Sequence, residues 1–247
     1  MLGLSLETLF LFCIVMVVVA FLYASVGHGG ASGYIALMTL FSFPIVFIKP
    51  TALVLNIFIA AVSFWYFNKR KYFNSSVFYP FVLSSLPASF IGGYLNVDPL
   101  LYKQVLGVVL FIAILRMMGF LGRERQVRSQ INVPLALLFG ALIGFFSGMI
   151  GIGGGILLSP LLLLLGWSNI KEAAAVSALF IFVNSASGLL GYLSHHSLET
   201  KHLYFVPVAL IGGALGAKLG SGKFSDSFLK YTLSFVLVLA CIKLTFL

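Results

Sequence analysis

Two clusters of glycines interrupt the apolar sequence of this chain, and they constrain its fold more than any other feature. The first reads Val26-Gly27-His28-Gly29-Gly30, and the second, 124 positions later, reads Ile150-Gly151-Ile152-Gly153-Gly154-Gly155. Such runs expose backbone N–H and C=O groups that lipid cannot satisfy, so within a membrane they have to line a cavity enclosed by protein. Two breaks at matching positions are typical of the central binding site of a transporter.

The composition indicates an all-α, polytopic integral membrane protein. Apolar residues make up 61% of the 247 residues, charged residues only 9%, and the mean hydropathy is +1.12. A soluble domain of this length cannot hide so much apolar surface, so membrane lipid is the expected surrounding. The net charge of +9 would suggest a nucleic-acid partner in a soluble protein, but here the basic residues form short clusters between apolar segments. We read these clusters as topology signals and expect no nucleic-acid partner.

The apolar runs predict ten hydrophobic segments, and the first five resemble the second five. After each glycine break a short apolar stretch is followed by Ile-Lys, a long segment, and then a segment rich in small residues that contains proline. We therefore expect two transmembrane repeats, residues 1–120 and 131–247, joined by a basic cytoplasmic linker at 121–130. The ten expected segments are 4–26, 31–48, 50–67, 77–95, 100–119, 132–150, 153–167, 172–193, 203–220 and 227–247.

Chain length and charge favour repeats of opposite orientation. Residues 4–48 as one helix would reach roughly 67 Å, against a hydrocarbon core of about 30 Å, so each break is expected to form a hairpin. A hairpin, whether it spans the membrane twice or re-enters it, returns the chain to the side where it started. Each repeat then crosses the membrane an odd number of times, so the second repeat starts on the opposite side and is inverted. With inverted repeats, eleven Lys and Arg residues fall inside the cell and four fall outside, namely Lys49, Lys103, Lys201 and Lys243. Parallel repeats give the weaker bias of nine against six.

The predicted substrate site lies where the two breaks meet. A helix that starts after each break would present free N–H groups and a partial positive charge, which suits an anion. His28 could donate to the anion, couple proton movement or serve as a structural donor, while Asn56 and Asn184 could bind substrate or join helices. Close helix packing is the alternative for the glycines. The substrate-binding candidates are Gly27, His28, Gly29, Gly30, Ser32, Asn56, Gly151, Gly153, Gly154, Gly155 and Asn184.

No catalytic pattern accompanies these candidates. His195, His196 and His202 cluster near Glu199 but do not have a recognised metal-ligand spacing, and no nucleotide-binding loop, Ser-His-Asp pattern or carboxylate pair occurs. We therefore expect no cofactor, no metal and no enzymatic activity. Two rivals stay open: a membrane-embedded enzyme that uses the loop histidines, and a non-transporting partner subunit. The oligomeric state is open too, with a homodimer among the alternatives.

These motifs together resemble the sulfite exporter TauE/SafE family of membrane permeases over nearly the whole chain. The resemblance rests on the paired breaks, on Ser159-Pro160 after the second break, on Lys49 and Lys171, and on the glycine-rich ninth segment. It implies secondary transport of small sulfur-containing or organic anions, such as sulfite and sulfonates, across the bacterial cytoplasmic membrane. The first break departs from the family pattern at His28 and Ala31, so the substrate of this chain can differ from that of named members.

Overall fold

A computed structural model describes residues 5–95 and 130–246, and the regular structure of this part is entirely helical. The expected segment 100–119 and all but the last residue of the linker 121–130 lie outside the described residues. The elements are α1 (Leu6–Ser25), α2 (Ala31–Leu40), α3 (Ile45–Lys69), α4 (Ser75–Tyr94), α6 (Val133–Ile150), α7 (Gly155–Leu164), α8 (Ile170–Leu193), the 3-10 helix η1 (Thr200–Leu203), α9 (Val206–Gly222) and α10 (Asp226–Phe246).

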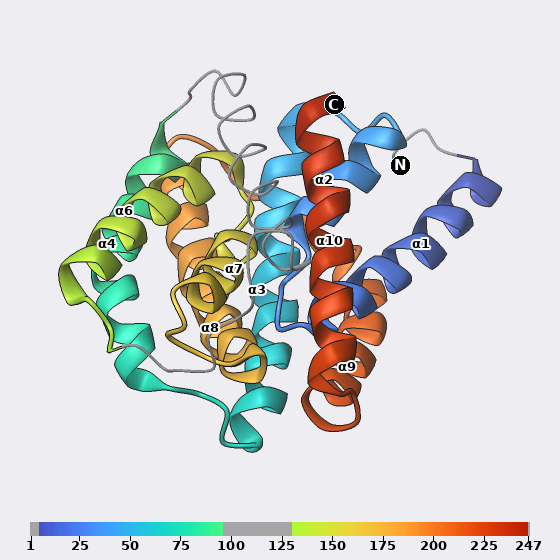
Figure 1. Cartoon of the computed structure of the whole chain (residues 1–247). Helices are drawn as coiled ribbons and strands as arrows, with labels where there is room; N and C mark the ends of the chain where they lie inside the picture. Colours follow the sequence, from blue (N-terminus) through green and yellow to red (C-terminus); the bar gives the residue numbers. More distant parts are fainter. Residues whose placement is uncertain (1–4, 96–129, 247) are drawn as a thin grey trace.

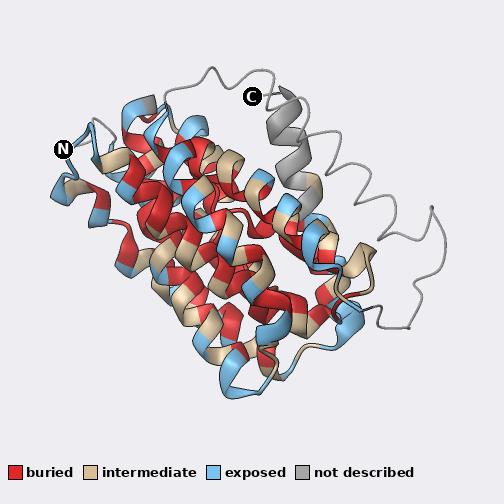
Figure 2. Ribbon diagram, turned by 90° about the vertical axis from the view of Figure 1, so that its left-hand side faces the viewer, coloured by how far each residue is buried: buried red, intermediate tan, exposed pale blue. Residues whose placement is uncertain are grey.

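Six helices in the described part are long and apolar enough to cross a membrane: α1, α3, α4, α6, α8 and the stretch from η1 through α9. Large apolar side chains project outward from the bundle, including those of Phe10, Leu83 and Tyr231, which are 70%, 69% and 77% exposed. Buried residues run through the interior, and exposed ones lie on outer helix faces and loops (Figure 2). Apolar outer faces suit contact with lipid. The predicted all-α, multi-pass membrane protein is confirmed, and the total number of segments stays a prediction.

One segment boundary differs from the prediction. The sequence placed a break at residues 48–50, whereas α2 ends at Leu40 and α3 already begins at Ile45. Proline disfavours a helical residue before it, so Pro44 prevents continuation from α2, and Ser42 takes a left-handed backbone with φ of 58°. Pro50 instead lies inside α3, where it removes only the hydrogen bond that would end on Val46.

The central pair of helices is α3 and α8, with α4 and α6 on one flank and α1 and α9 on the other (Figure 1). Glycines let the flanking helices approach closely. On α9, Gly212, Gly216 and Gly220 face the main chain of α1, and on α6 three glycines spaced in the same way face α4. A Cβ atom at any of these positions would overlap a carbonyl oxygen of the neighbouring helix. Small-residue contacts of this kind are the usual means of packing helices in membranes.

The close contacts also give the direction of each helix. Contacts of α9 with α1 advance together along both chains, from Gly212 against Val17 to Gly220 against Ser25, so these two helices run parallel. The same test makes α3 parallel to α9, and α6 and α8 parallel to α4. Contacts between α3 and α8 run in opposite senses, from Asn56 with Ser185 to Phe67 beside Ala174. The helices α1, α3 and α9 therefore point one way and α4, α6 and α8 the other.

A consequence is that each glycine break belongs to a hairpin. Because α1 and α3 run in the same direction, residues 26–44, which include α2, return the chain to the side from which α1 started. In the same way, residues 151–169, which include α7, return the chain between α6 and α8. Both returning helices are short, at ten residues each.

Candidate functional site

Both breaks depend on backbone conformations that favour glycine. In the first break Gly27 and Gly30 have φ of 78° and 97°, and in the second Gly151, Gly153 and Gly154 have φ of 88°, 74° and 77°. Residues with a Cβ atom rarely adopt this left-handed region. The turns end at Gly30 and Gly154, which are the N-cap residues of α2 and α7. The sequence therefore starts a new helix at each break.

The two breaks meet through His28. Its Nε2 atom lies 2.9 Å from the carbonyl oxygen of Gly155, 127 residues away in the chain, and its Nδ1 atom lies 3.1 Å from the carbonyl oxygen of Val26. The side chain is 1% exposed. Carbonyl oxygens only accept hydrogen bonds, so a neutral ring donates to one of these two oxygens and only the imidazolium form donates to both. In this conformation His28 ties the first break to the second.

Asn56 of α3 lies between the breaks. Its Oδ1 atom accepts the N–H of Ala31, the first residue of α2, at 3.0 Å, and its Nδ2 atom donates to Oγ of Ser185 on α8 at 3.2 Å. A Cβ atom on Gly29 would overlap Oδ1 of Asn56, and one on Gly153 would lie 2.6 Å from Nδ2. Asn56 thus caps one returning helix while its amide borders both glycine loops.

The other two side-chain candidates have different surroundings. Ser32 shares a hydrogen bond of 2.8 Å with the hydroxyl group of Tyr23, within the α1–α2 hairpin. Asn184 donates from Nδ2 to the carbonyl oxygen of Phe180 at 2.9 Å, and its buried Oδ1 atom has no hydrogen-bond partner among the described residues. Among the described residues, no hydrogen bond joins the side chain of Asn184 to the glycines of either break.

Backbone donors remain free at both breaks, with more of them at the second. Within residues 5–95 and 130–246, the N–H groups of Gly153, Gly154, Gly155 and Ile156 meet no acceptor. At the first break the N–H groups of Gly29, Gly30 and Gly33 are also without an acceptor in this part of the chain, but Asn56 occupies the N–H of Ala31. Unused N–H groups at a helix N-terminus carry partial positive charge and suit an anion. The start of α7 is therefore the better candidate site for an anion.

Two residues outside the predicted substrate-binding set also border the breaks. The ring of Tyr34 lies against Gly30, and its buried hydroxyl group has no partner among the described residues. Ser147 of α6 packs against Gly154, and its buried hydroxyl group is likewise unpartnered there. Both residues lie in apolar runs, where an isolated hydroxyl is easily read as ordinary helix packing. No signal in the sequence singled them out.

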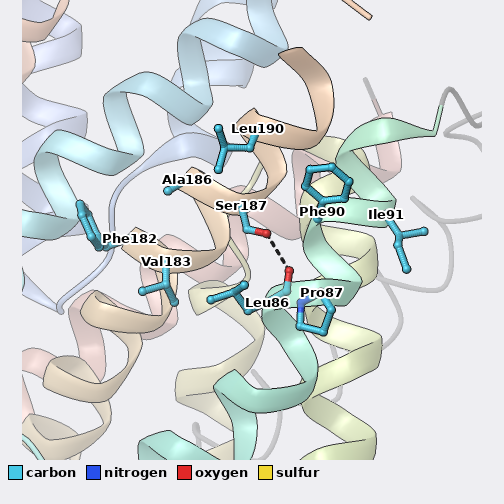
Figure 3. Close-up of a pocket in the computed structure, with 9 residues that line it drawn as sticks. All are labelled: Leu86, Pro87, Phe90, Ile91, Phe182, Val183, Ala186, Ser187 and Leu190. Atoms are coloured by element: carbon cyan, nitrogen blue, oxygen red, sulfur yellow. Dashed lines mark hydrogen bonds between the residues drawn. The ribbon is translucent and has the colours of Figure 1, made fainter. Parts of the chain in front are cut away.

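A separate apolar groove of about 550 Å³ lies between α4 and α8 (Figure 3). Ser187, its one hydroxyl-bearing lining residue, donates to the carbonyl oxygen of Leu86 at 2.7 Å. The groove therefore offers an anion no unused side-chain donor. No group of three or more His, Cys, Asp or Glu side chains that could hold a metal ion occurs among the described residues, the loop histidines included.

Comparison with known proteins points to one family. The profile described as "Sulfite exporter TauE/SafE" matches residues 12–244. "Probable membrane transporter protein y4hK" of Sinorhizobium fredii is 37% identical over 232 residues, which are 92% of this chain and 94% of the relative. "Probable membrane transporter protein YunE" of Bacillus subtilis is 36% identical over 99 residues, 40% of this chain and 36% of the relative. "Probable membrane transporter protein YfcA" of Escherichia coli is 28% identical over 142 residues, 56% of this chain and 51% of the relative. No solved structure matches significantly.

Proposed function

The chain belongs to the sulfite exporter TauE/SafE family of membrane transporters, and on that premise we propose that it moves small anions across the bacterial cytoplasmic membrane as a secondary transporter. The candidate substrates are sulfite, sulfonates and other sulfur-containing or organic anions. The names of the relatives describe membrane transporters, which is compatible with a protein that is not an enzyme.

One observation carries this proposal: the four unused N–H groups at the start of α7 lie beside His28 and Asn56, in the interior of the helix bundle. A buried cluster of donors without a carboxylate favours a negatively charged substrate over a cation. The breaks themselves are buried, with His28 and Ile152 only 1% and 7% exposed. Substrate would reach them after movement of one repeat against the other, as alternating access requires.

We further propose that the two repeats, residues 1–120 and 131–247, are inverted relative to one another. Support comes from the opposite directions of α1 and α6, of α3 and α8, and of α9 and α4. Basic residues expected inside also lie at one end of the described part of the bundle. Gly222 at the end of α9 packs against Arg70 at the end of α3, and Lys171 lies over the ring of Tyr72. This end is the proposed cytoplasmic side.

Transport is tested with the purified full chain in proteoliposomes. The assay follows uptake of sulfite, methanesulfonate, sulfoacetate and acetate, each with a proton gradient, a sodium gradient or no gradient, against empty liposomes. We expect saturable uptake of at least one sulfur-containing anion. No uptake of any of these anions under any gradient would favour a non-transporting partner subunit, the rival function.

The site is tested with His28→Ala, matched by Ile152→Ala at the equivalent position of the second break. Loss of the bond to Gly155 should displace the N–H groups of α7, so the His28 variant should bind methanesulfonate at least tenfold more weakly, while it still inserts and folds. The Ile152 variant keeps that bond and should bind close to normally. Equal binding of every tested anion by the His28 variant and the unaltered protein would refute the site assignment.

The orientation is tested by labelling single cysteines in intact cells, in a chain without Cys13 and Cys241. Inverted repeats predict that Ser197→Cys labels from outside and Lys223→Cys does not. A cysteine at position 97, outside the described residues, should label from outside as well. Accessibility of position 223 in place of 197 would support parallel repeats.

A further inference from the structure

A second cavity, of about 460 Å³, lies at the opposite end of the bundle from Arg70, where α3 begins and α8 ends. Its lining includes three of the four histidines of the chain, His195, His196 and His202, together with the aromatic rings of Phe47 and Tyr192. The first turn of α3 and the last turn of α8 both border it. Because these helix ends have opposite dipole charges that offset one another, the side chains decide the charge of this cavity.

The hydrogen bonds of two histidines fix which ring nitrogen carries the proton. Thr51 donates its hydroxyl hydrogen to the carbonyl oxygen of Phe47 at 2.6 Å, so Nδ1 of His202, 2.9 Å from the same hydroxyl oxygen, has to be the donor. Nδ1 of His196 faces the carbonyl oxygen of Tyr192 at 3.2 Å and has to donate too. In both neutral rings Nε2 therefore carries a lone pair, and it becomes an N–H donor only when the ring takes a second proton.

Aromatic rings lie next to all three histidines. His196 stacks on Tyr192 with ring centroids 4.2 Å apart, and His202 stacks on Phe47 at 4.8 Å. His195 lies 4.4 Å from the ring of Tyr94. These ring contacts hold the imidazoles in place at the wall of the cavity.

The remaining charged groups around this cavity leave it basic. Its carboxylate, on Glu199, is 2.8 Å from the ammonium group of Lys201, and this hydrogen bond lowers the pKa of Glu199 below its ordinary value. Glu199 therefore stays ionised and paired at mildly acidic pH. The titratable groups that face the histidines are thus Tyr94, Tyr192, Lys49 and the Glu199–Lys201 pair.

Lys49 connects this cavity to the second glycine break. Its ammonium group lies 5.6 Å from the centroid of the Tyr192 ring, which lines the cavity. A Cβ atom on Gly151 would lie 3.1 Å from Cγ of Lys49, so the stem of the lysine packs beside the break. No carboxylate pairs with Lys49 in the part of the chain that the structure describes. A half-buried cation without a carboxylate partner thus lies between the cavity and the free N–H groups of α7.

From these contacts we propose that the cavity lined by His195, His196 and His202 is a vestibule that binds small sulfonate-like or carboxylate anions when the exposed His196 is protonated, and that Lys49 attracts the anion toward the second break. This inference deepens the proposed function and rests on it. Acidic pH outside the cell would then load the vestibule, and the lone pairs of the neutral rings would release the anion.

The test uses equilibrium binding of radiolabelled methanesulfonate to the purified full chain at pH 5.5 and pH 7.5, since a sulfonate stays singly charged at both. We expect about tenfold tighter binding at pH 5.5, because a charge-assisted hydrogen bond from Nε2 of His196 becomes available. The double variant His196→Gln/His202→Gln should bind equally at both pH values. His196→Gln alone, at an exposed residue that folding does not require, should reduce the pH effect.

Controls separate this vestibule from the central site. Lys49→Gln should weaken binding at both pH values, whereas Lys171→Gln, at the other end of the bundle, should not. His28→Gln should keep the pH effect. Loss of the pH effect in His28→Gln, or persistence of the pH effect in the double histidine variant, would overturn the proposal. Uptake with the same pH profile in the double variant and the unaltered protein would refute the vestibule but leave the transport function intact. Binding that depends on pH without transport of any anion would support the vestibule and refute the transport function.

Discussion

The two glycine breaks have the same backbone design but use their hydrogen-bonding groups differently. Both end at a glycine in the left-handed conformation and both start a helix of ten residues. At the first break the protein's own side chain occupies the helix start, since Asn56 binds the N–H of Ala31. At the second break four N–H groups remain without an acceptor among the described residues.

This difference changes where selectivity is expected. The sequence places His28, a possible donor to the anion, in the first break. In the structure the ring of His28 reaches across to the carbonyl oxygen of Gly155, so it acts on the second break. The first hairpin therefore supplies the side chains, and the second supplies the backbone donors. An anion held at the second break would experience both.

The largest expected effect is a difference in stability between two glycine-to-alanine variants, one in each break, because the two glycines are packed differently. Gly27→Ala and Gly151→Ala place a Cβ atom on backbones of similar φ, which costs about 1–2 kcal/mol in each case. At Gly27 that atom would also overlap the main chain of Ala174, which cannot move without displacing α8. At Gly151 its nearest neighbour would be Cγ of Lys49 at 3.1 Å, and the carbonyl oxygen of Lys49 and Cγ of Leu53 would lie at 3.4 Å and 3.5 Å, in ordinary contact. Gly27→Ala should lose a further 1–3 kcal/mol, roughly, and yield little folded protein.

The measurement is the yield of monodisperse protein in detergent and its midpoint of thermal unfolding. Gly151→Ala serves as the matched control because it introduces the same methyl group and the same backbone strain. Equal losses for the two variants would mean that the backbone conformation alone, and not the contact with α8, decides the stability of the breaks.

The next effect contrasts the two asparagines of the central helices. Asn56→Ala leaves the N–H of Ala31 and the hydroxyl of Ser185 without their partner, at a cost of about 2 kcal/mol or more. Asn184→Ala removes a bond to the carbonyl oxygen four residues earlier and an oxygen that already lacks a partner among the described residues, so it should cost less than about 1 kcal/mol.

Thermal unfolding in detergent and methanesulfonate uptake in proteoliposomes measure this contrast. Only Asn56→Ala should reduce uptake, by more than tenfold, because the cap on α2 also positions the first break against the second. If Asn184→Ala proved the more damaging of the two, the substrate would have to lie nearer α6 and Ser147 than the breaks imply.

Much of the fold could be predicted because apolar length and glycine punctuation are local signals. The predicted ends of α1, α6 and α8 agree with the observed ones within two residues. The start of α3 could not be placed, because Pro44 and Pro50 are equally good local breaks and only packing decides between them. Asn56 was identified as a polar residue inside an apolar run, but its bond to Ala31 depends on how α2 folds back. The contact between His28 and Gly155 joins the two halves of the chain, and nothing local in the sequence specifies it.

The smallest expected effect concerns the lysines that follow the breaks. Lys171 lies 3.5 Å from Asp226, with side chains 20% and 62% exposed, and an exposed pair of this kind contributes only about 0–1 kcal/mol. Asp226→Asn should therefore leave thermal unfolding in detergent almost unchanged.

The same substitution would, however, leave Lys171 without that carboxylate, which is the situation of Lys49 at the other end of the bundle. If the unpaired state of Lys49 is what attracts the anion, Asp226→Asn should slightly strengthen methanesulfonate binding at the proposed cytoplasmic end, by less than about threefold, and this gain should disappear in Asp226→Asn/Lys171→Gln. A gain that survives in the double variant would have to come from the net charge of the protein and not from Lys171.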